Sequence, residues 1–224
     1  GRPGGLFLGG AARPSFLFRC GPVRKAFYVA IEGPLGVGKS TLARRLAARL
    51  GAGLVLDPAG GNPFLARFYR DRERYALPTQ LHFLLNRHRQ QEEVRRSKFF
   101  QSYVVSDYLM EKDRIFARLN LEGEEMQLYE EVWRRLGAGA PPPHLVVLLR
   151  ASTEELLRRV ARRDRPFERG MERDYLDALN GAYAEFFARY RGAPVLELDT
   201  EKVDPTRDEG ALEELVGAVR KKAE

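Results

Sequence analysis

Residues 26–41 read AFYVAIEGPLGVGKST, and this stretch decides the fold class. Its first seven residues form a short apolar run, which is typical of a strand buried in a sheet. Gly33 to Ser40 then match the pattern G-x-x-x-x-G-K-[ST] in full. From Ser40 to Leu50, apolar residues recur at helical spacing. A strand, a glycine-rich turn and a helix therefore follow one another, which is the context that this pattern requires.

The residue types of this turn suit it to hold the phosphates of a nucleotide. Glycines let backbone N–H groups turn towards an anion with no Cβ in the way, and the following helix points its positive end at the same anion. A lysine here can reach the β and γ phosphates, and the serine hydroxyl can ligate Mg²⁺. We expect a nucleoside triphosphate, with ATP as the expected donor, to bind Gly33, Pro34, Leu35, Gly36, Val37, Gly38, Lys39, Ser40 and Thr41.

Beyond this turn, apolar segments alternate with helical patterns. Further strands are expected at residues 53–56, 103–105, 145–149 and 194–198. Helices are expected at residues 40–50, 63–76, 79–97, 109–119, 124–136, 152–163, from after 170 to about 190, and 212–219, with Pro78 marking a break. Alternation of this kind predicts a parallel sheet covered on both faces. The predicted fold is α/β, a three-layer α/β/α arrangement of the P-loop NTPase type around a mostly parallel five-stranded sheet.

Composition predicts one soluble domain. The chain has 224 residues, of which 44% are hydrophobic and 31% charged, and this suits a single well-formed core. No apolar run approaches the roughly 18 residues needed to cross a bilayer. The one cysteine, Cys20, excludes an internal disulfide framework and fits a reducing compartment. We therefore expect a cytoplasmic protein with no membrane partner.

The formal net charge of +7 is concentrated at the N-terminus. Residues 1–25 hold five basic residues and no acid, so the remaining chain carries +2. That value is ordinary for a domain that binds a triphosphate, and it argues against a broad surface for nucleic acid. Residues 1–24, rich in glycine and proline, are expected to form a disordered extension, and residues 25–224 the nucleotide-binding domain.

Several stretches together resemble the deoxynucleoside kinase family, especially its bacterial purine-specific members. The likeness spans about residues 26–200. It is carried by residues 31–41, by Asn62-Pro63-Phe64-Leu65 with Phe68-Tyr69, by Gln80 with Arg87, by Ser106-Asp107-Tyr108 through Ile115-Phe116-Ala117, and by RDRPFE at residues 163–168. The resemblance implies that ATP, with Mg²⁺ as cofactor, phosphorylates the 5′-hydroxyl of a deoxynucleoside. It also implies a homodimer.

Two aspartates would take the catalytic and metal-binding places. Asp57 closes the second expected strand, where the family has a glutamate that accepts the proton of the 5′-hydroxyl. Such a carboxylate must lie within hydrogen-bond reach of the attacking oxygen, and aspartate is one methylene shorter; a plain Asp-Pro turn is the alternative. Asp107 resembles the acid that helps Ser40 to hold Mg²⁺, an ion that prefers oxygen ligands. Tyr108 stands where the family often has an arginine near the reacting oxygen.

The resemblance also implies contacts to the sugar and the base. Tyr69 and Glu168 match the pair that binds the sugar 3′-hydroxyl, where a phenol and a carboxylate leave little room for a 2′-hydroxyl. Gln80 and Arg87 are seven residues apart, which on a helix places both on one face, and the family pair in these positions faces the base. For Arg87, a surface charge is the competing interpretation.

Two residues further along would complete the base site. Asp113 resembles an acid that accepts a hydrogen bond from an exocyclic amino group of the base. Phe116 would place its ring against the base, with a role in the helix core as the alternative. The spacing from Asp107 to Phe116 is one residue shorter than in some family members, so an alignment from Phe116 would displace Asp113.

Arg159, Arg163 and Arg165 resemble the arginines of a lid, expected near residues 162–170, that closes over the transferring phosphoryl group. Guanidinium groups match the charged equatorial oxygens of that group. The alternative is a solvated basic helix end that favours the helix dipole.

Several functions remain open on the sequence alone. The leading one is a purine deoxynucleoside kinase for deoxyguanosine or deoxyadenosine, with deoxycytidine as an alternative substrate. A nucleoside monophosphate kinase of the thymidylate type shares the phosphate-binding turn and the lid, but it must also bind an acceptor phosphate. A P-loop ATPase that acts as a nucleic-acid or protein-partner switch would need a recognition module, and none is evident.

Overall fold

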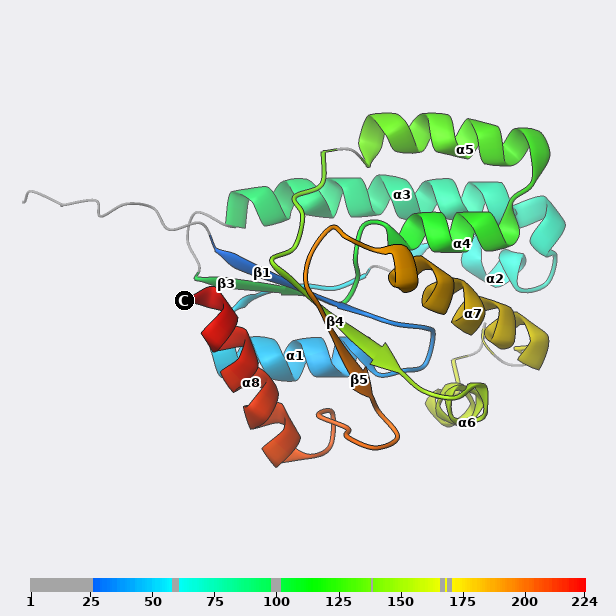
Figure 1. The fold of residues 1–224 in the computed structure, drawn as a ribbon. Coiled ribbons are helices and arrows are strands. Elements are labelled where there is room, and N and C mark those ends of the chain that lie inside the picture. Colours follow the sequence, from blue (N-terminus) through cyan, green and yellow to red (C-terminus); the bar gives the residue numbers. More distant parts are fainter. Residues whose placement is uncertain (1–25, 58–60, 98–101, 138, 166–167, 169–170) are drawn as a thin grey trace, which may run out of the picture.

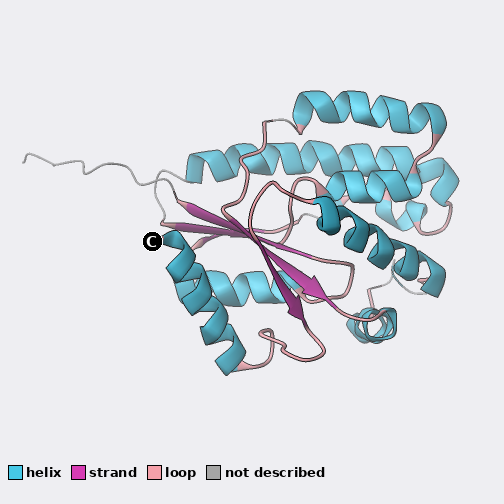
Figure 2. Cartoon of the chain, viewed as in Figure 1, coloured by secondary structure: helices cyan, strands magenta, loops and turns pink. Residues whose placement is uncertain are grey.

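The computed structural model describes residues 26–57, 61–97, 102–137, 139–165, 168 and 171–224. The expected N-terminal extension and four residues of the expected lid lie outside these ranges. Within them, five parallel strands form one sheet in the order β2-β3-β1-β4-β5 (Figures 1 and 2). Their bounds are β1 Phe27–Glu32, β2 Gly53–Val55, β3 Tyr103–Ser106, β4 Leu145–Arg150 and β5 Val195–Asp199.

Helices cover both faces of this sheet, as the α/β/α prediction requires. Helices α1 and α8 lie on one face, while α3, α4 and α7 lie on the other with α5 outside them (Figure 1). The bounds are α1 Lys39–Leu50, α2 Leu65–Phe68, α3 Arg72–Ser97, α4 Lys112–Asn120, α5 Gly123–Leu136, α6 Thr153–Arg163, α7 Arg173–Arg189 and α8 Glu209–Ala223. Among the described residues, no helix has the length and apolar character needed to span a bilayer.

The core follows from the apolar runs of the central strands. In β4, every residue from Leu145 to Leu149 is buried, as expected for a strand that is covered on both faces. Each such side chain contributes about 1.5–3 kcal/mol when it is fully buried. Leu42 and Leu46 of α1 pack against one face of the sheet, and Leu176 of α7 belongs to the same core.

One prediction of a helix break is wrong. The helical structure is interrupted between Phe68 and Arg72, whereas α3 continues through Pro78. Proline removes one intrahelical hydrogen bond, but the residues beside it are anchored by burial. Ala76 is 1% exposed and Gln80 is 2% exposed, and α3 packs on α2, α4 and α5. Tertiary packing therefore overrides the local preference of proline, and Gln80 and Arg87 share one continuous helix.

The turn after β1 is held close to its neighbours. Gly33 has φ 147°, and a Cβ on it would lie 2.4 Å from the Leu149 carbonyl oxygen. Gly36 has φ 87°, and a Cβ there would lie 2.9 Å from Cγ2 of Val160. Both conformations are rare for residues with a side chain. The turn therefore fits against β4 and α6 only because these positions are glycine.

A pair of glycine substitutions tests this packing. Gly33→Ala is expected to lower the free energy of unfolding by about 1–3 kcal/mol, because it combines backbone strain with a clash. Gly217→Ala is the control: Gly217 lies inside α8 with no atom near its absent Cβ, so alanine is expected to raise stability by about 0.5–1 kcal/mol. Urea unfolding measures both, and equal effects would contradict this view of the turn.

Candidate active site

Three strand ends bring the expected site residues together. The glycine-rich turn follows β1, Asp57 lies two residues after β2, and Asp107 directly follows β3. Because these neighbouring strands are parallel, their carboxyl ends meet at one edge of the sheet, which is where ligands of open α/β sheets bind. The two aspartates therefore lie beside the turn, although about 50 residues separate them in the sequence.

The turn of residues 33–40 has the form of a phosphate cradle. Gly38, with φ 109°, caps the N-terminus of α1, so that the helix dipole points into the turn. The Lys39 ammonium donates to the carbonyl oxygens of Gly33 at 2.7 Å and Pro34 at 2.8 Å. Burial, and then the nearby Lys112 ammonium, lower the pKa of Lys39 to about 7. An anion in the cradle would stabilise the charged form of this lysine.

Asp107 connects the cradle to Asp57. Its Oδ2 accepts a hydrogen bond from the Ser40 hydroxyl, and its Oδ1 accepts one from the backbone N–H of Asp57 at 2.6 Å. A serine hydroxyl beside a carboxylate supplies the hard oxygen ligands that Mg²⁺ prefers. The two residues predicted to hold the metal are thus adjacent and fit it.

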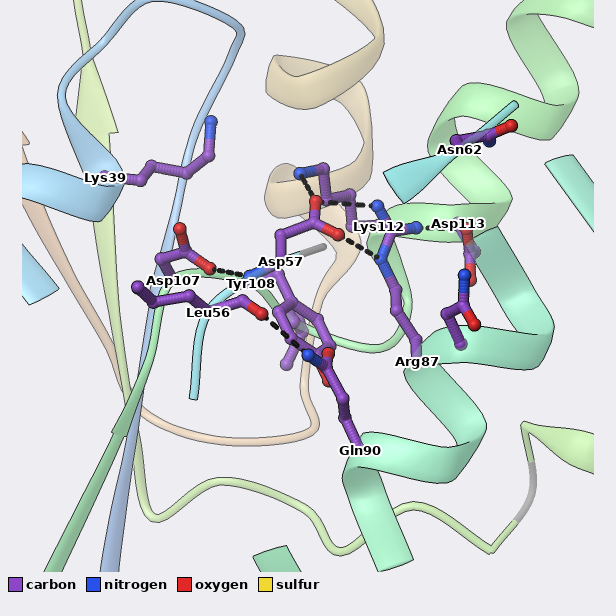
Figure 3. A network of polar contacts seen from close by, with 12 residues as sticks. Lys39, Leu56, Asp57, Asn62, Arg87, Gln90, Asp107, Tyr108, Lys112 and Asp113 are labelled. Atoms are coloured by element: carbon purple, nitrogen blue, oxygen red, sulfur yellow. Dashed lines mark hydrogen bonds and ion pairs between the residues drawn. The ribbon is translucent and has the colours of Figure 1, made fainter. Parts of the chain in front are cut away.

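Asp57 lies at the centre of a buried ion cluster (Figure 3). Its Oδ2 accepts from Nη2 of Arg87 at 2.8 Å and from Nζ of Lys112 at 2.8 Å. The two cations reach the carboxylate from different sides, and Arg87 also pairs with Asp113. Burial alone would raise the pKa of Asp57, but Arg87 and Lys112 hold it well below its usual range. Asp57 is therefore ionised at neutral pH.

Arg87 and Asp113 are in direct contact. Arg87 is only 3% exposed, so the interpretation as a surface charge is wrong. The family position that Asp113 matches stays open, because the contact with Arg87 does not depend on the alignment. Burial raises the pKa of Asp113 to about 7, although Arg87 opposes the shift.

Five of the six expected substrate-binding side chains line one cavity next to this cluster, whereas Asp113 is fully buried and is not among the lining residues. Gln80, Arg87, Phe116, Tyr69 and Glu168 all line it. The remaining lining residues are Leu35, Asp57, Leu65, Phe68, Thr79, Phe83, Lys112, Arg165 and Tyr175. Burial, with the Glu168 carboxylate contributing, raises the pKa of Tyr69, which therefore remains a neutral hydrogen-bonding phenol at neutral pH.

The three predicted lid arginines divide into two groups. Arg163 and Arg165 both pair with Glu168, with Nη2 of Arg163 at 2.6 Å and Nη1 of Arg165 at 3.7 Å from Oε1. Arg159 instead donates to the carbonyl oxygen of Val37 at 3.2 Å and to the hydroxyl of Thr200 at 2.8 Å. Arg159 therefore braces the cradle, whereas Arg165 lines the cavity and Arg163 contacts its lining residue Glu168.

Sequence reasoning assigned no role to two residues that help to build the site. Lys112 contacts Asp57, as described above. Glu32 is fully buried at the end of β1 and accepts from the N–H groups of Gly33 at 2.9 Å and Leu109 at 2.8 Å and from the Tyr183 hydroxyl at 3.0 Å. A charged residue that ends an apolar strand directly before the cradle was the available signal for Glu32. For Lys112, no sequence pattern indicated the contact with Asp57, because only the folded structure brings the two residues together.

Removal of Arg87 tests the cluster. Arg87→Met leaves Asp113 without its cation and Asp57 with one, so we expect a loss of about 3–5 kcal/mol in the free energy of unfolding at pH 8. Arg135→Met, at an exposed pair with Glu131, is the control and should cost less than about 1 kcal/mol.

The loss at Arg87 should depend on pH. A carboxyl whose pKa is raised in the folded state favours folding most at low pH, and this contribution is lost as the pH rises through about 7. Asp113 is therefore increasingly protonated below pH 7 and needs its cation less. Urea unfolding of Arg87→Met should show a smaller loss at pH 5.5 than at pH 8, and an equal or larger loss would contradict the pairing.

Known proteins are similar to this chain in both sequence and fold. The family model for deoxynucleoside kinase matches residues 29–223. The chain is 30% identical to deoxyguanosine kinase of Bacillus subtilis over 200 residues, which cover 86% of this chain and 96% of that protein. It is 28% identical to deoxyadenosine/deoxycytidine kinase of the same species over 207 residues, covering 88% and 93%.

A solved structure supports the same fold. Deoxyadenosine kinase from M. mycoides, with dCMP and dCDP bound, superimposes with a TM-score of 0.76 at 22% identity, over 87% of this chain and 100% of that one. The predicted α/β fold of the P-loop type is thus confirmed. With the family model matching nearly the whole described chain, this protein belongs to the deoxynucleoside kinase family.

Proposed function

We propose that this deoxynucleoside kinase transfers the γ-phosphoryl group of ATP to the 5′-hydroxyl of a purine deoxynucleoside, with deoxyguanosine preferred and Asp57 as the acceptor of the hydroxyl proton. One observation carries the proposal: an ionised carboxylate borders both the phosphate cradle and the cavity. Asp57 is tied to the cradle through Asp107 and Ser40, and it lines the cavity itself. Family membership leaves no reason to retain the thymidylate-type kinase or the ATPase switch.

The phosphoryl transfer needs little covalent chemistry from the protein. Asp57 would orient the 5′-hydroxyl and take its proton as the new O–P bond forms. Lys39 would neutralise charge on the β and γ phosphates, and Arg163 and Arg165 would bind the transferring group when they leave Glu168. Ser40 and Asp107 would hold Mg²⁺, which when bound would supply positive charge that offsets the charge of the phosphates.

The sugar would be bound at the end of the cavity where Tyr69 and Glu168 lie. The Tyr69 hydroxyl can donate to the 3′-oxygen, and the carboxylate of Glu168 can accept from the same hydroxyl. Glu168 is 4% exposed and pairs with Arg163. A sugar that binds Glu168 would thus release Arg163 from this carboxylate. The released arginine could then stabilise the charge of the phosphates, so substrate binding and charge stabilisation would be linked.

The hydrogen-bonding groups at the base end favour guanine. Oε1 of Gln80 and Oδ2 of Asp113 are buried acceptors without a hydrogen-bond partner within the described chain. Gln80 lines the cavity, whereas Asp113 lies outside its lining and pairs with Arg87, a donor that does line it. Guanine offers two adjacent donors, N1–H and the 2-amino group, and the O6 acceptor. Adenine and cytosine each offer a single amino group as donor. Buried polar groups left unpaired are costly, so guanine satisfies this set best.

The names of the relatives include purine deoxynucleosides and deoxycytidine, so they do not decide between bases. One is named a deoxyguanosine kinase and another a deoxyadenosine/deoxycytidine kinase. A further relative, 31% identical over 188 residues, is the deoxyadenosine kinase of Dictyostelium discoideum. Deoxyadenosine and deoxycytidine are therefore the competing substrates, and the arrangement of acceptors is what favours deoxyguanosine.

The resemblance also leads us to propose a cytoplasmic homodimer. A groove between α4 and α7 is a suitable surface for a second copy, because apolar side chains such as Leu119 and Phe186 line it beside charged ones such as Arg118 and Glu185. Sedimentation at the 25.5 kDa mass of one chain would exclude the dimer.

A substrate panel tests the base preference. With Mg·ATP, we expect kcat/KM to be highest for deoxyguanosine, with deoxyadenosine and deoxycytidine at least about tenfold lower, because each leaves a buried acceptor unpaired. Thymidine monophosphate should accept no phosphate, and excess EDTA should abolish all transfer. A coupled assay for ADP gives each value, and a higher kcat/KM for deoxyadenosine or deoxycytidine would reject the preference.

Asp57→Asn tests the base role. Asparagine has a similar size but accepts no proton, so kcat should fall by about 10²–10⁴-fold while ATP still binds. Glu130→Gln, at a partly exposed ion pair with Arg114, is the matched loss of one carboxylate and should retain kcat. Turnover of Asp57→Asn within threefold of the parent would remove Asp57 from this role.

A further inference from the structure

Deoxynucleoside kinases often have an arginine near the reacting oxygen, at the position directly after the acid that Asp107 matches. This chain lacks that arginine and its positive charge. In this chain, Tyr108 follows Asp107. The Tyr108 side chain is fully buried, and its hydroxyl accepts a hydrogen bond from Nε2 of Gln91 at 3.2 Å. Its ring lies 5.5 Å from the guanidinium of Arg87. Tyr108 is thus a packing residue that brings no positive charge to the reacting atoms.

Lys112 carries a charge in an unusual place. It is the first residue of α4, where the positive end of the helix dipole disfavours a cation. It is also only 8% exposed, although lysine is almost never buried unless it is paired. A lysine that is buried at the N-terminus of a helix needs a contact that compensates for both the helix dipole and the burial. That contact is the Asp57 carboxylate, 2.8 Å away.

The ammonium of Lys112 also lies where the reaction would take place. Lys112 lines the cavity together with Asp57 and Phe116, and its Nζ is 5.6 Å from the centre of the Phe116 ring. It is close enough to the cradle to act electrostatically on Lys39. Burial would lower the pKa of Lys112, but Asp57 raises it above its ordinary value. The group therefore remains a cation at neutral pH.

We propose that Lys112 is a catalytic residue that replaces the missing arginine: its ammonium contacts the 5′-oxygen and the phosphoryl group during transfer. This inference rests on the proposed function. In the step, the bond from the 5′-oxygen to the γ-phosphorus forms and the bond from that phosphorus to the β,γ-bridging oxygen breaks. The bridging electrons leave with ADP, and the hydroxyl proton goes to Asp57. Lys112 remains protonated and stabilises the oxygens that carry the charge.

A role through Asp57 alone is the competing explanation, because Lys112 could merely hold that carboxylate in place. The two explanations predict different effects on the residual rate when Asp57 is replaced by neutral asparagine. If Lys112 acts only on Asp57, its loss has no effect in an Asp57→Asn background. If it contacts the phosphoryl group, its loss lowers the residual rate further. A double-mutant cycle measures this difference directly.

The test uses the full chain with Mg·ATP and deoxyguanosine at pH 7.5. Lys112→Met should lower kcat by about 10²–10³-fold and change the KM for deoxyguanosine by less than threefold. Lys112→Arg should recover at least tenfold of that loss, since it restores the cation. Lys221→Met, an exposed lysine in the last turn of α8, is the control and should match the parent. If Lys112→Met does not fold, Lys112→Gln takes its place.

The cycle gives the deciding result. Adding Lys112→Met to Asp57→Asn should lower the residual kcat at least tenfold more. No further loss, or kcat within threefold of the parent for Lys112→Met alone, would overturn the proposal. Either of these outcomes, with a parent chain that phosphorylates deoxynucleosides, rejects only the role of Lys112. A parent chain that transfers no phosphate to any deoxynucleoside would reject the proposed function itself.

Discussion

The ion cluster around Asp57 is the constraint on which the site depends. Two carboxylates and two cations are removed from water here, and such burial costs several kcal/mol for each ion unless every charge is paired. The pairing therefore fixes the relative positions of three elements: the segment after β2, α3 through Arg87, and α4 through Lys112. Because the cluster also borders the cavity, the ion pairs that fix these elements also fix part of the cavity wall.

Hydrogen bonds carry this constraint to the phosphate cradle. Asp107 links the Ser40 hydroxyl to the backbone of Asp57, and Glu32 links the start of the cradle to the segment before α4 and to α7. Both acids are nearly or fully buried, so they cannot exchange these partners for water without a large cost. The cradle and the cavity are thereby held in register, which is what transfer between two substrates bound there would demand.

Some elements were readable from local sequence, and others were not. The strand before Gly33, the cradle and the helix expected from residue 40 follow from apolar periodicity and glycine spacing, which are local properties. The break at Pro78 was misplaced because burial of Ala76 and Gln80 outweighs a local preference. For Arg87, the sequence left a surface charge as the alternative to a role at the base, since its partners Asp57 and Asp113 are 30 and 26 residues away.

The sequence by itself determined the α/β class, the five strands, the cradle and the family resemblance, because these depend on periodicity and on spacing within one segment. Only the tertiary structure decided that Asp57 binds Arg87 and Lys112, that Asp113 meets Arg87, and that Arg159 braces the cradle. The physical reason is that a charge is stabilised by whichever opposite charge the fold brings near it. Which charges pair depends on where the ends of parallel strands meet in the fold, and no local sequence pattern predicts this.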